Sequence, residues 1–482
     1  MKHTFKFMAL ALLVALSLTS CKKEYTITVM SNNTNWGTTE GTGVYVEGKS
    51  VKISAFPKSG YYFIKWNDNV TDNPRTIQVT GDATYTAYFS DDPNGGGQGG
   101  DTTNTDPLTM SGTISSNVTW QDRGLTVDYI VEGTLNIDGN ALLTIAPGVT
   151  IMFTGTDGGF YVGENAGLKM VGTADKPIVF QGPTNNPNNG SWYGITINST
   201  RSDNQFEYVQ FLRGGSGSAN WEGVVNVNGR LSMRHCTING SLNNGLSIQN
   251  DGYMTAFENN EIKNCSASPI YSDNFAGACK NIGTGNTFSG NTNNRFHVYG
   301  GGYLDSENLT IHNIGIPYFL ENGGFDGDNR TLTIEAGVVI EVPANTNLNV
   351  GGSLCIVANG TSSSPIIFRA DGGANWNGMT FFSERSGNSL SYCQFQNGGR
   401  GTDWDNKACL YIGGDAVLSL TNCTFGPSLH YGVAIEHIEN WGNVTHSGNT
   451  FTNCQGGNVY IEYGGEYGGT EYEDGQVLNQ LP

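Results

Sequence analysis

The sequence has little charge, and most of the charge it has is negative. Only 14% of the 482 residues are Asp, Glu, Lys or Arg, and the formal net charge is −19. Binding to a nucleic-acid backbone requires a clustered basic surface, because each phosphate carries a negative charge. The composition therefore excludes nucleic acid as the expected partner.

Several catalytic and metal-binding patterns are also missing. There is no CxxC, no GxSxG and no Walker loop, and the histidines His430, His437 and His446 lack the spacing of a zinc site. The 68 glycines, together with many Asn and Thr residues, favour short strands and tight turns over helices. We therefore expect an all-β protein.

Long apolar runs are absent except at the N-terminus, where two lysines precede the run Met8–Leu18 and the segment ends Leu-Thr-Ser-Cys at Cys21. This segment resembles a bacterial lipoprotein signal, which implies removal of residues 1–20 and lipid attachment at Cys21. Lys22 follows, where an inner-membrane retention signal has Asp, so the resemblance implies the outer membrane. An ordinary secretory signal with a chance cysteine is the alternative.

Residues 21–89 alternate apolar and polar positions between Gly-rich or Asn-rich turns, which predicts a small antiparallel β-domain. This stretch resembles the divergent internalin-type B-repeat, which implies a spacer or adhesion module without catalytic residues. The resemblance lies in Gly48-x-x-Val51, Ala55-x-Pro57, Gly60-Tyr-x-Phe63, Trp66 and Ala87-x-Phe89. We expect Trp66 and Tyr61 to be core residues rather than sugar-stacking ones.

Residues 90–107 contain almost no large apolar side chain and predict a flexible linker, after which similar short strands recur every 23 to 30 residues or so. This period predicts a solenoid of about thirteen coils over residues 108–465. The order of landmarks repeats, which indicates two duplicated cassettes at 129–316 and 317–465. The matching landmarks are Pro177 and Pro365, Trp192 and Trp376, Cys236 and Cys423, and Cys265 and Cys454.

The repeated strands resemble those of the right-handed parallel β-helix, the pectate-lyase-like superfold, which specifies architecture better than function. Stacked coils place equivalent side chains in ladders. The expected inner ladder comprises Phe211, Ile238, Ile262, Phe288 and Ile311, continued by Phe395, Phe425 and Phe451. Two residues beyond it we expect an asparagine stack at a repeated bend, formed by Asn264, Asn313, Asn397 and Asn453. Cys236, Cys393 and Cys423 are expected to be small buried residues on the inner face, with a Cys393–Cys423 bridge geometrically allowed.

Two equivalent loops carry the candidate ligand surface, because each combines an Arg, a Trp and a carboxylate, as in a sugar-stacking platform. The candidates are Arg213, Trp221 and Glu222 in the first loop, and Arg400, Asp403, Trp404 and Asp405 in the second. Each Trp folded over the flank of a coil is the simpler interpretation. Asp326 and Asp328 are a weak metal candidate, since Asp-Gly-Asp-Asn favours a tight turn over a calcium site.

These features favour a lipid-anchored envelope protein that binds a polysaccharide or another surface component, without a cofactor. The superfold also implies an alternative, a polysaccharide lyase or glycoside hydrolase, of which the lyase would use Ca²⁺. A purely structural envelope protein is the third hypothesis. Residues 466–482 form an acidic, Gly-rich tail that either caps the last coil or hangs free.

Overall fold

The computed structural model describes residues 23–90, except 35 and 69, and residues 106–482, except 187, 301, 305, 306 and 405. The chain forms two compact units, residues 1–101 and 102–482. The predicted signal segment, Cys21 and residues 91–105 lie outside the described residues. Among those described, no helix is both long and apolar enough to cross a membrane.

The small unit consists of two sheets around a core that includes the fully buried Trp66. Four of its five strand pairings are antiparallel, as predicted, and β1 pairs with β7 in parallel. One sheet has the order β3-β1-β7-β5 and the other β2-β4-β6. Their bounds are Glu24–Ser31 (β1), Gly37–Glu40 (β2), Gly43–Val46 (β3), Ser50–Pro57 (β4), Tyr62–Trp66 (β5), Arg75–Gln78 (β6) and Ala83–Ser90 (β7).

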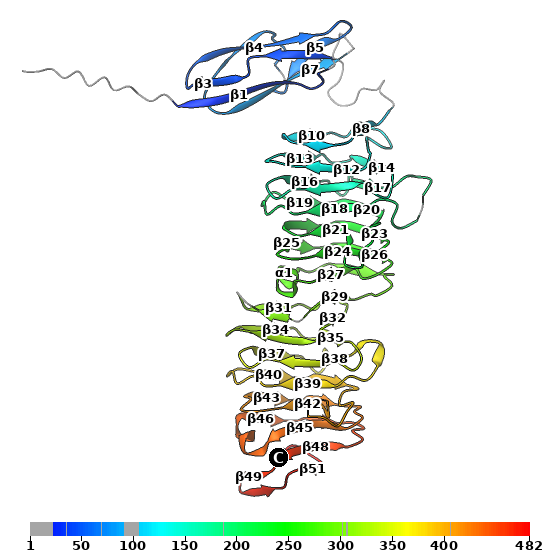
Figure 1. Cartoon of the computed structure of the whole chain (residues 1–482), viewed down its shortest axis with the longest axis vertical. Coiled ribbons are helices and arrows are strands. Elements are labelled where there is room, and N and C mark those ends of the chain that lie inside the picture. The colour runs from blue at the N-terminus through cyan, green and yellow to red at the C-terminus, as the bar shows by residue number, and fades with distance from the viewer. Residues whose placement is uncertain are drawn as a thin grey trace, which may run out of the picture. The chain divides into compact units, whose positions relative to one another are not determined.

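The large unit is a parallel β-solenoid, which confirms the predicted fold (Figure 1). Its first half uses three sheets. Sheet 1 contains Leu108–Met110 (β8), Tyr129–Val131 (β11), Thr150–Phe153 (β14), Ile178–Gln181 (β17), Val209–Gly214 (β20), Thr237–Ser241 (β23), Glu261–Cys265 (β26) and Thr287–Ser289 (β28). Sheet 3 contains Val118–Trp120 (β10), Leu142–Ile145 (β13), Gly167–Val171 (β16), Gln205–Glu207 (β19), Arg230–Arg234 (β22) and Tyr253–Glu258 (β25).

Sheet 2 runs through both halves with 14 strands. Its strands are Thr113–Ile114 (β9), Thr134–Ile137 (β12), Gly159–Val162 (β15), Gly194–Ile197 (β18), Gly223–Val227 (β21), Asn244–Ile248 (β24), Ile270–Ser272 (β27), Phe296–Val298 (β29), Tyr318–Leu320 (β32), Val339–Val342 (β35), Ile366–Ala370 (β38), Cys393–Gln396 (β41), Thr424–Phe425 (β44) and Thr450–Phe451 (β47).

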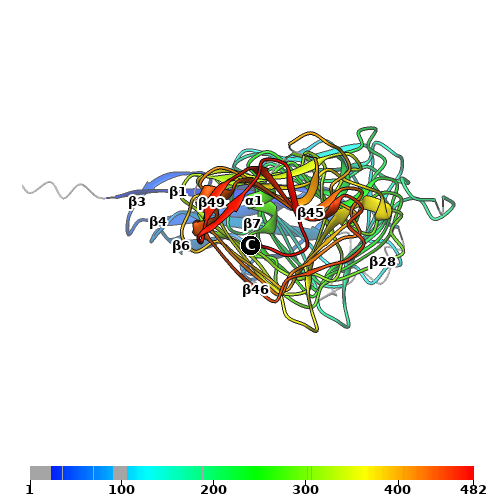
Figure 2. The same cartoon turned by 90° about the horizontal axis from the view of Figure 1, so that it is seen from below.

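Two further sheets complete the second half. Sheet 4 contains Gly302–Leu304 (β30), Gly324–Gly327 (β33), Asn347–Val350 (β36), Gly378–Phe381 (β39), Ala408–Ile412 (β42), Tyr431–His437 (β45), Gly457–Tyr463 (β48) and Gln476–Leu478 (β51). Sheet 5 contains Leu309–Ile311 (β31), Thr331–Ile334 (β34), Cys355–Asn359 (β37), Ser389–Ser391 (β40), Leu418–Thr421 (β43) and Val444–Ser447 (β46). Two 3₁₀ helices, Asp371–Gly373 (η1) and Ile438–Asn443 (η2), lie between strands. Viewed from the end, the coils overlie one another (Figure 2).

The two halves meet at a short helix, Phe275–Cys279 (α1), which contacts β25 of sheet 3 and β30 of sheet 4. Through β28, which follows this helix, the coils keep the order sheet 1, sheet 2, sheet 3, with α1 in place of the last sheet 3 strand. From β29 onward the order is sheet 2, sheet 4, sheet 5. Strands at equivalent positions of the two cassettes therefore belong to different sheets. The Pro-Ile-Val-Phe strand β17 lies in sheet 1, whereas its counterpart β38 lies in sheet 2.

This shift corrects the expected single inner ladder. Phe211, Ile238, Ile262 and Phe288 are paired neighbours on sheet 1. Phe395, Phe425 and Phe451 are paired on sheet 2, where their rings stack with centroids 5.1 and 5.4 Å apart. Ile311 belongs to neither ladder, since it pairs with Ile334 on sheet 5. The interior is thus one buried hydrophobic column, to which equivalent strands of the two cassettes contribute side chains from different sheets.

The same shift explains the outcome at the asparagine bend. Asn264, Asn397 and Asn453 have positive φ angles of 59°, 58° and 52°, as expected for a repeated left-handed bend. Asn313 does not, because it follows the sheet 5 strand β31 and instead accepts a hydrogen bond from Gly315 N with its side chain. The buried ladder also contains asparagines: the side chain of Asn260 accepts from Cys236 N at 3.0 Å, and that of Asn449 from Cys423 N at 2.9 Å.

Cys236, Cys393 and Cys423 are fully buried on the inner face, as predicted, and all eight cysteines of the described residues are free thiols. Burial raises the pKa of the Cys236 thiol to about 12. The three cysteines are therefore packing residues of the inner face.

The last residues lie against the final coil. β51 pairs antiparallel with β48, and Gly465–Tyr467 (β49) forms a hairpin with Thr470–Tyr472 (β50). The carbonyl oxygen of Pro482 lies 2.7 Å from His446 Nε2 and accepts from Trp441 Nε1 at 3.3 Å. Residues 466–482 thus cap the solenoid, the first of the two arrangements that their composition allowed.

Candidate functional site

An aromatic row lies on the outer face of sheet 2 at the junction of the two halves, on β27, β29 and β32 (Figure 1). Tyr271 pairs with His297, which pairs with Phe319. Their rings meet edge to face, with centroids 5.1 and 5.2 Å apart. Edge-to-face packing is a favourable arrangement of aromatic groups, so the row is a firm apolar surface on the outside of the coil.

A groove of about 610 Å³ lies over this row. Trp221 and Tyr299 lie at its rim, 48% and 51% exposed, whereas Tyr271 is buried in its floor. Amide and hydroxyl groups complete the lining, from Asn220, Asn244, Gln249, Ser268 and Asn293. An apolar floor with a few polar groups at the sides is the usual composition of a ligand site.

One polar group in the groove lacks a protein partner. Ser268 is buried and its backbone N–H donates to the Asn244 side chain at 3.1 Å, but within the described residues its hydroxyl makes no hydrogen bond. An unsatisfied buried hydroxyl costs about 1–3 kcal/mol. The hydroxyl oxygen is almost wholly inaccessible, so it lies beneath the surface that a ligand would touch.

The loop between β20 and β21 holds Trp221 in place. The Glu222 carboxylate accepts from the Tyr193 hydroxyl at 2.5 Å and from Ala219 N at 2.9 Å. The Trp221 carbonyl accepts from the Ser247 hydroxyl at 2.6 Å. The indole therefore projects from a hydrogen-bonded loop, and little conformational entropy would be lost when it contacts a ligand.

The carboxylates that line the groove are those of Asp273 and Glu321, and His297 lies in the lining beside them. His297 Nε2 lies 2.8 Å from the Glu321 carboxylate. Burial, followed by the nearby Asp273 and Glu321 charges, raises the pKa of Tyr271 to about 12. No lysine or arginine is among the residues that line it; the adjacent Arg295 packs 3.7 Å over the Phe319 ring and pairs with Asp371 at 2.6 Å. The groove is therefore electronegative.

The two predicted loops are not brought together. The first connects sheet 1 to sheet 2 and the second connects sheet 2 to sheet 4, so they lie at different corners of the coil, seven coils apart. Of the first loop, Trp221 reaches the groove, Glu222 supports the loop, and Arg213 occupies a bend with φ of 57°.

In the second loop, Trp404 is 51% exposed and packs against Phe382 and Tyr411, with centroids 6.1 and 5.8 Å apart. Asp403 belongs to a local turn, in which its N–H donates to the Asn406 side chain at 3.0 Å. Arg400 is exposed, and Asp405 lies outside the described residues.

Strand register identifies the residues of the second cassette that correspond to the groove. Val225 pairs with Ile195 and Leu410 pairs with Met379, and Ile195 and Met379 belong to the equivalent Trp-x-Gly-x-Thr strands β18 and β39. Counting from these pairs, Glu222, Asn226, Tyr271 and Asp273 correspond to Lys407, Tyr411, Tyr460 and Glu462.

The corresponding space in the second cassette is filled by its own side chains. Lys407 Nζ lies 3.0 Å from the Glu462 carboxylate and 5.1 Å from the centroid of the Tyr460 ring. The Tyr411 hydroxyl donates to Glu462 at 3.0 Å. In the groove the large Tyr411 is replaced by Asn226, whose side chain bonds back to Gly223.

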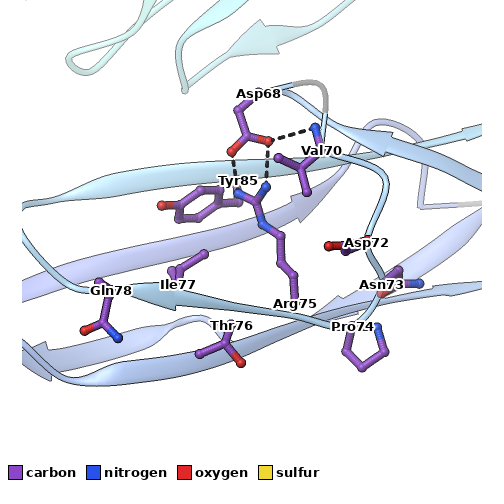
Figure 3. A pocket seen from close by; sticks show the side chains of 10 residues that line it. All are labelled: Asp68, Val70, Asp72, Asn73, Pro74, Arg75, Thr76, Ile77, Gln78 and Tyr85. Carbon is purple, nitrogen blue, oxygen red and sulfur yellow. Dashed lines mark hydrogen bonds and ion pairs between the residues drawn. The ribbon is translucent and has the colours of Figure 1, made fainter.

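Other candidates offer less. Asp326 and Asp328 flank the turn after β33, where the Asp326 side chain accepts from Gly327 N at 2.8 Å. Among the described residues no three His, Cys, Asp or Glu side chains gather as a metal site. Figure 3 shows a hollow on the small unit, in which the Arg75 guanidinium pairs with Asp68 at 2.5 Å and lies 4.8 Å over the Tyr85 ring. This arginine already has its carboxylate, so it is not available to hold an anionic ligand in the hollow.

The sequence interpretation missed most of the groove, namely Ser268, Tyr271, Asp273, His297, Tyr299 and Glu321. A signal was present in the cassette alignment, since Tyr271-Ser-Asp273 repeats as Tyr460-Ile-Glu462. This repeat indicates a surface position only if both tyrosines face outward, and that direction follows from the pairing register of their strands.

Comparison with known families agrees with the fold. Residues 112–271 match the model of the pectate-lyase-like β-helix domain, and residues 25–93 match that of the divergent InlB B-repeat domain. No curated protein and no solved structure matches the chain. The combination of the two domains indicates a surface or carbohydrate-related protein, and the first match includes Trp221 and Tyr271 of the groove.

Proposed function

We propose that this protein binds a glycan in the groove on the outer face of sheet 2, as a lipid-anchored protein of the cell envelope. The observation that carries the proposal is the groove itself, in which the half-exposed rings of Trp221 and Tyr299 stand over the buried Tyr271 and amide side chains line the sides. Sugars present apolar CH faces that stack on aromatic rings and hydroxyls that pair with amides and hydroxyls.

Anchoring is proposed from the Leu-Thr-Ser-Cys21 pattern and the Lys22 that follows it. The lipid would be attached at Cys21, in the outer membrane, with the B-repeat unit as a spacer. Replacement of Cys21 by Ser should move the protein from the membrane fraction to the soluble fraction and abolish incorporation of labelled fatty acid. Retention of both properties in the variant would contradict the anchor.

A glycan-binding screen with the full-length chain tests the groove. We expect Trp221→Ala to lower affinity about tenfold or more, because an aromatic anchor at a binding site contributes about 2 kcal/mol or more. Trp404→Ala is the matched control, since Trp404 is equally exposed at the equivalent loop but lies outside the groove. Equal losses in both variants, or in neither, would contradict the assignment.

Catalysis is a second candidate because of one pair, His297 and Glu321, 2.8 Å apart in the groove. A histidine oriented by a carboxylate is a common general base. Calcium belongs to the lyase form of this alternative and not to the binding proposal. An assay for unsaturated or reducing-end products on each bound glycan, repeated with His297→Ala, distinguishes the two: turnover lost in the variant would establish an enzyme.

A further inference from the structure

The second cassette contains a bound ammonium group that belongs to the protein itself. Lys407 is buried, and its Nζ lies 3.0 Å from the Glu462 carboxylate and 5.1 Å from the centre of the Tyr460 ring. The carboxylate supplies charge and the ring supplies the negative face of its π system, so together they favour a primary ammonium. Tyr460 and Glu462 project from adjacent outward positions of β48.

The groove retains the tyrosine and the acid but lacks the cation. Tyr271 and Asp273 occupy the positions of Tyr460 and Glu462, while Lys407 is replaced by Glu222. Asn226 stands in place of Tyr411, and its side chain bonds back to Gly223. Asp273 is exposed, and its only hydrogen bond within the described residues is from Asn250 N at 2.8 Å, so its second oxygen is available.

A third carboxylate strengthens the preference. Glu321 lines the groove together with Asp273, and these two charges help burial to raise the pKa of Tyr271 to about 12. No arginine or lysine is among the described residues that line the groove, and the adjacent Arg295 is already paired with Asp371, so the Asp273 and Glu321 carboxylates would repel a polyuronate there. The groove is thus unsuited to the acidic polysaccharides that the pectate-lyase-like fold suggests.

We propose that the glycan bound in this groove carries free amino groups, as in a polymer of unacetylated hexosamine, and that one ammonium lies between the Tyr271 ring and the Asp273 carboxylate as Lys407 does at Tyr460 and Glu462. The inference rests on the proposed glycan-binding function and specifies its ligand class. The sugar rings would stack on Trp221, and sugar hydroxyls would pair with the amide groups that line the groove.

Calorimetric titration of the full-length chain with three hexamers tests this: glucosamine, N-acetylglucosamine and galacturonate, at a mildly acidic pH where the amines are protonated. We expect the glucosamine hexamer to bind about tenfold or more tightly than its acetylated form, and the galacturonate hexamer not to bind. Added salt should weaken only the amine ligand.

Variants identify the group responsible. Asp273→Asn keeps the acceptor for Asn250 N and should reduce the preference for the amine over the acetylated hexamer about tenfold, with affinity for the acetylated form nearly unchanged. Glu462→Gln, the equivalent change in the filled cassette, should leave the preference intact.

Each outcome bears on one of the two claims. Equal binding of the two hexosamine hexamers, a preference for galacturonate, or an amine preference that survives Asp273→Asn would overturn the ammonium site while glycan binding stands. If no hexamer and no glycan of a wider panel binds, the proposed function itself is wrong.

Discussion

The two cassettes of the solenoid have the same backbone plan but treat one position on the outer surface differently. In the second cassette Lys407, Tyr411 and Glu462 form a satisfied, buried group. In the first, Asp273 lines a groove of about 610 Å³, whereas the corresponding Glu222 and Asn226 bond to Tyr193 and Gly223. Equivalent positions on the outer surface are therefore filled in one cassette and open in the other without a change of fold.

The largest expected effect concerns what the cassettes share. Phe211→Ala and Phe395→Ala each remove a fully buried ring from an inner ladder and should lower the free energy of unfolding by about 3–5 kcal/mol. Urea denaturation followed by fluorescence measures the loss. Tyr161→Ala, on the exposed outer face of sheet 2, is the control and should cost less than about 0.5 kcal/mol. A small loss in only one Phe variant would mean that the rotated cassettes are not equally packed.

The next effect separates the filled position from the open one. Lys407→Met leaves the largely buried Glu462 with the Tyr411 hydroxyl as its one remaining partner and should destabilise the protein by about 2 kcal/mol. Asp273→Asn has no internal cation to lose and should change stability little. Thermal unfolding of both variants tests the pair, and equal stabilities would remove the distinction between the cassettes.

A graft sharpens the comparison at the level of function. The double replacement Glu222→Lys and Asn226→Tyr rebuilds the filled arrangement in the first cassette and should lower glycan affinity about tenfold or more, equivalent to about 1.4 kcal/mol. Circular dichroism verifies that the variant remains folded. Undiminished binding by a folded variant would show that the ligand lies elsewhere.

The last prediction concerns the loss of stability at alkaline pH. A tyrosine in the unfolded chain ionises near pH 10, whereas the pKa of Tyr271 is raised to about 12. Between these values the folded state binds more protons, so stability is fully present below pH 10 and falls as pH rises toward 12. Tyr271→Phe should fall less steeply than the wild type when denaturation midpoints are compared over this range. Identical slopes would contradict the raised pKa.

The sequence indicated much of the inner structure because inward side chains recur at the coil period. Phe211, Ile238 and Ile262 were placed correctly on one face, and Cys236 was correctly interpreted as buried. The continuation to Ile311 and Phe395 was wrong, because periodicity counts residues per coil and does not register a shift by one face at a helix. The two equivalent loops also do not form one surface, because they connect different sheets and lie seven coils apart.

On the outside of the coils the sequence was less informative. Trp221 was singled out as an unusual residue in a polar loop, but Tyr271 and His297 resembled ordinary strand residues. Whether a strand tyrosine faces inward or outward changes with a register shift of one residue, and that register is set by pairing with neighbouring coils.

What the sequence by itself determined is the repeating column: strands of one length, separated by turns of Gly and Asn, must stack because no single coil can bury its apolar face. What the tertiary structure decided is the relation between the cassettes and the groove that results from it. Contacts between residues 20 to 30 positions or more apart determine the change of sheet order near α1. They also determine which side chains of adjacent coils lie beside each outward side chain. Such contacts leave no local pattern, which is why the open and filled positions could be distinguished only after the coils were stacked.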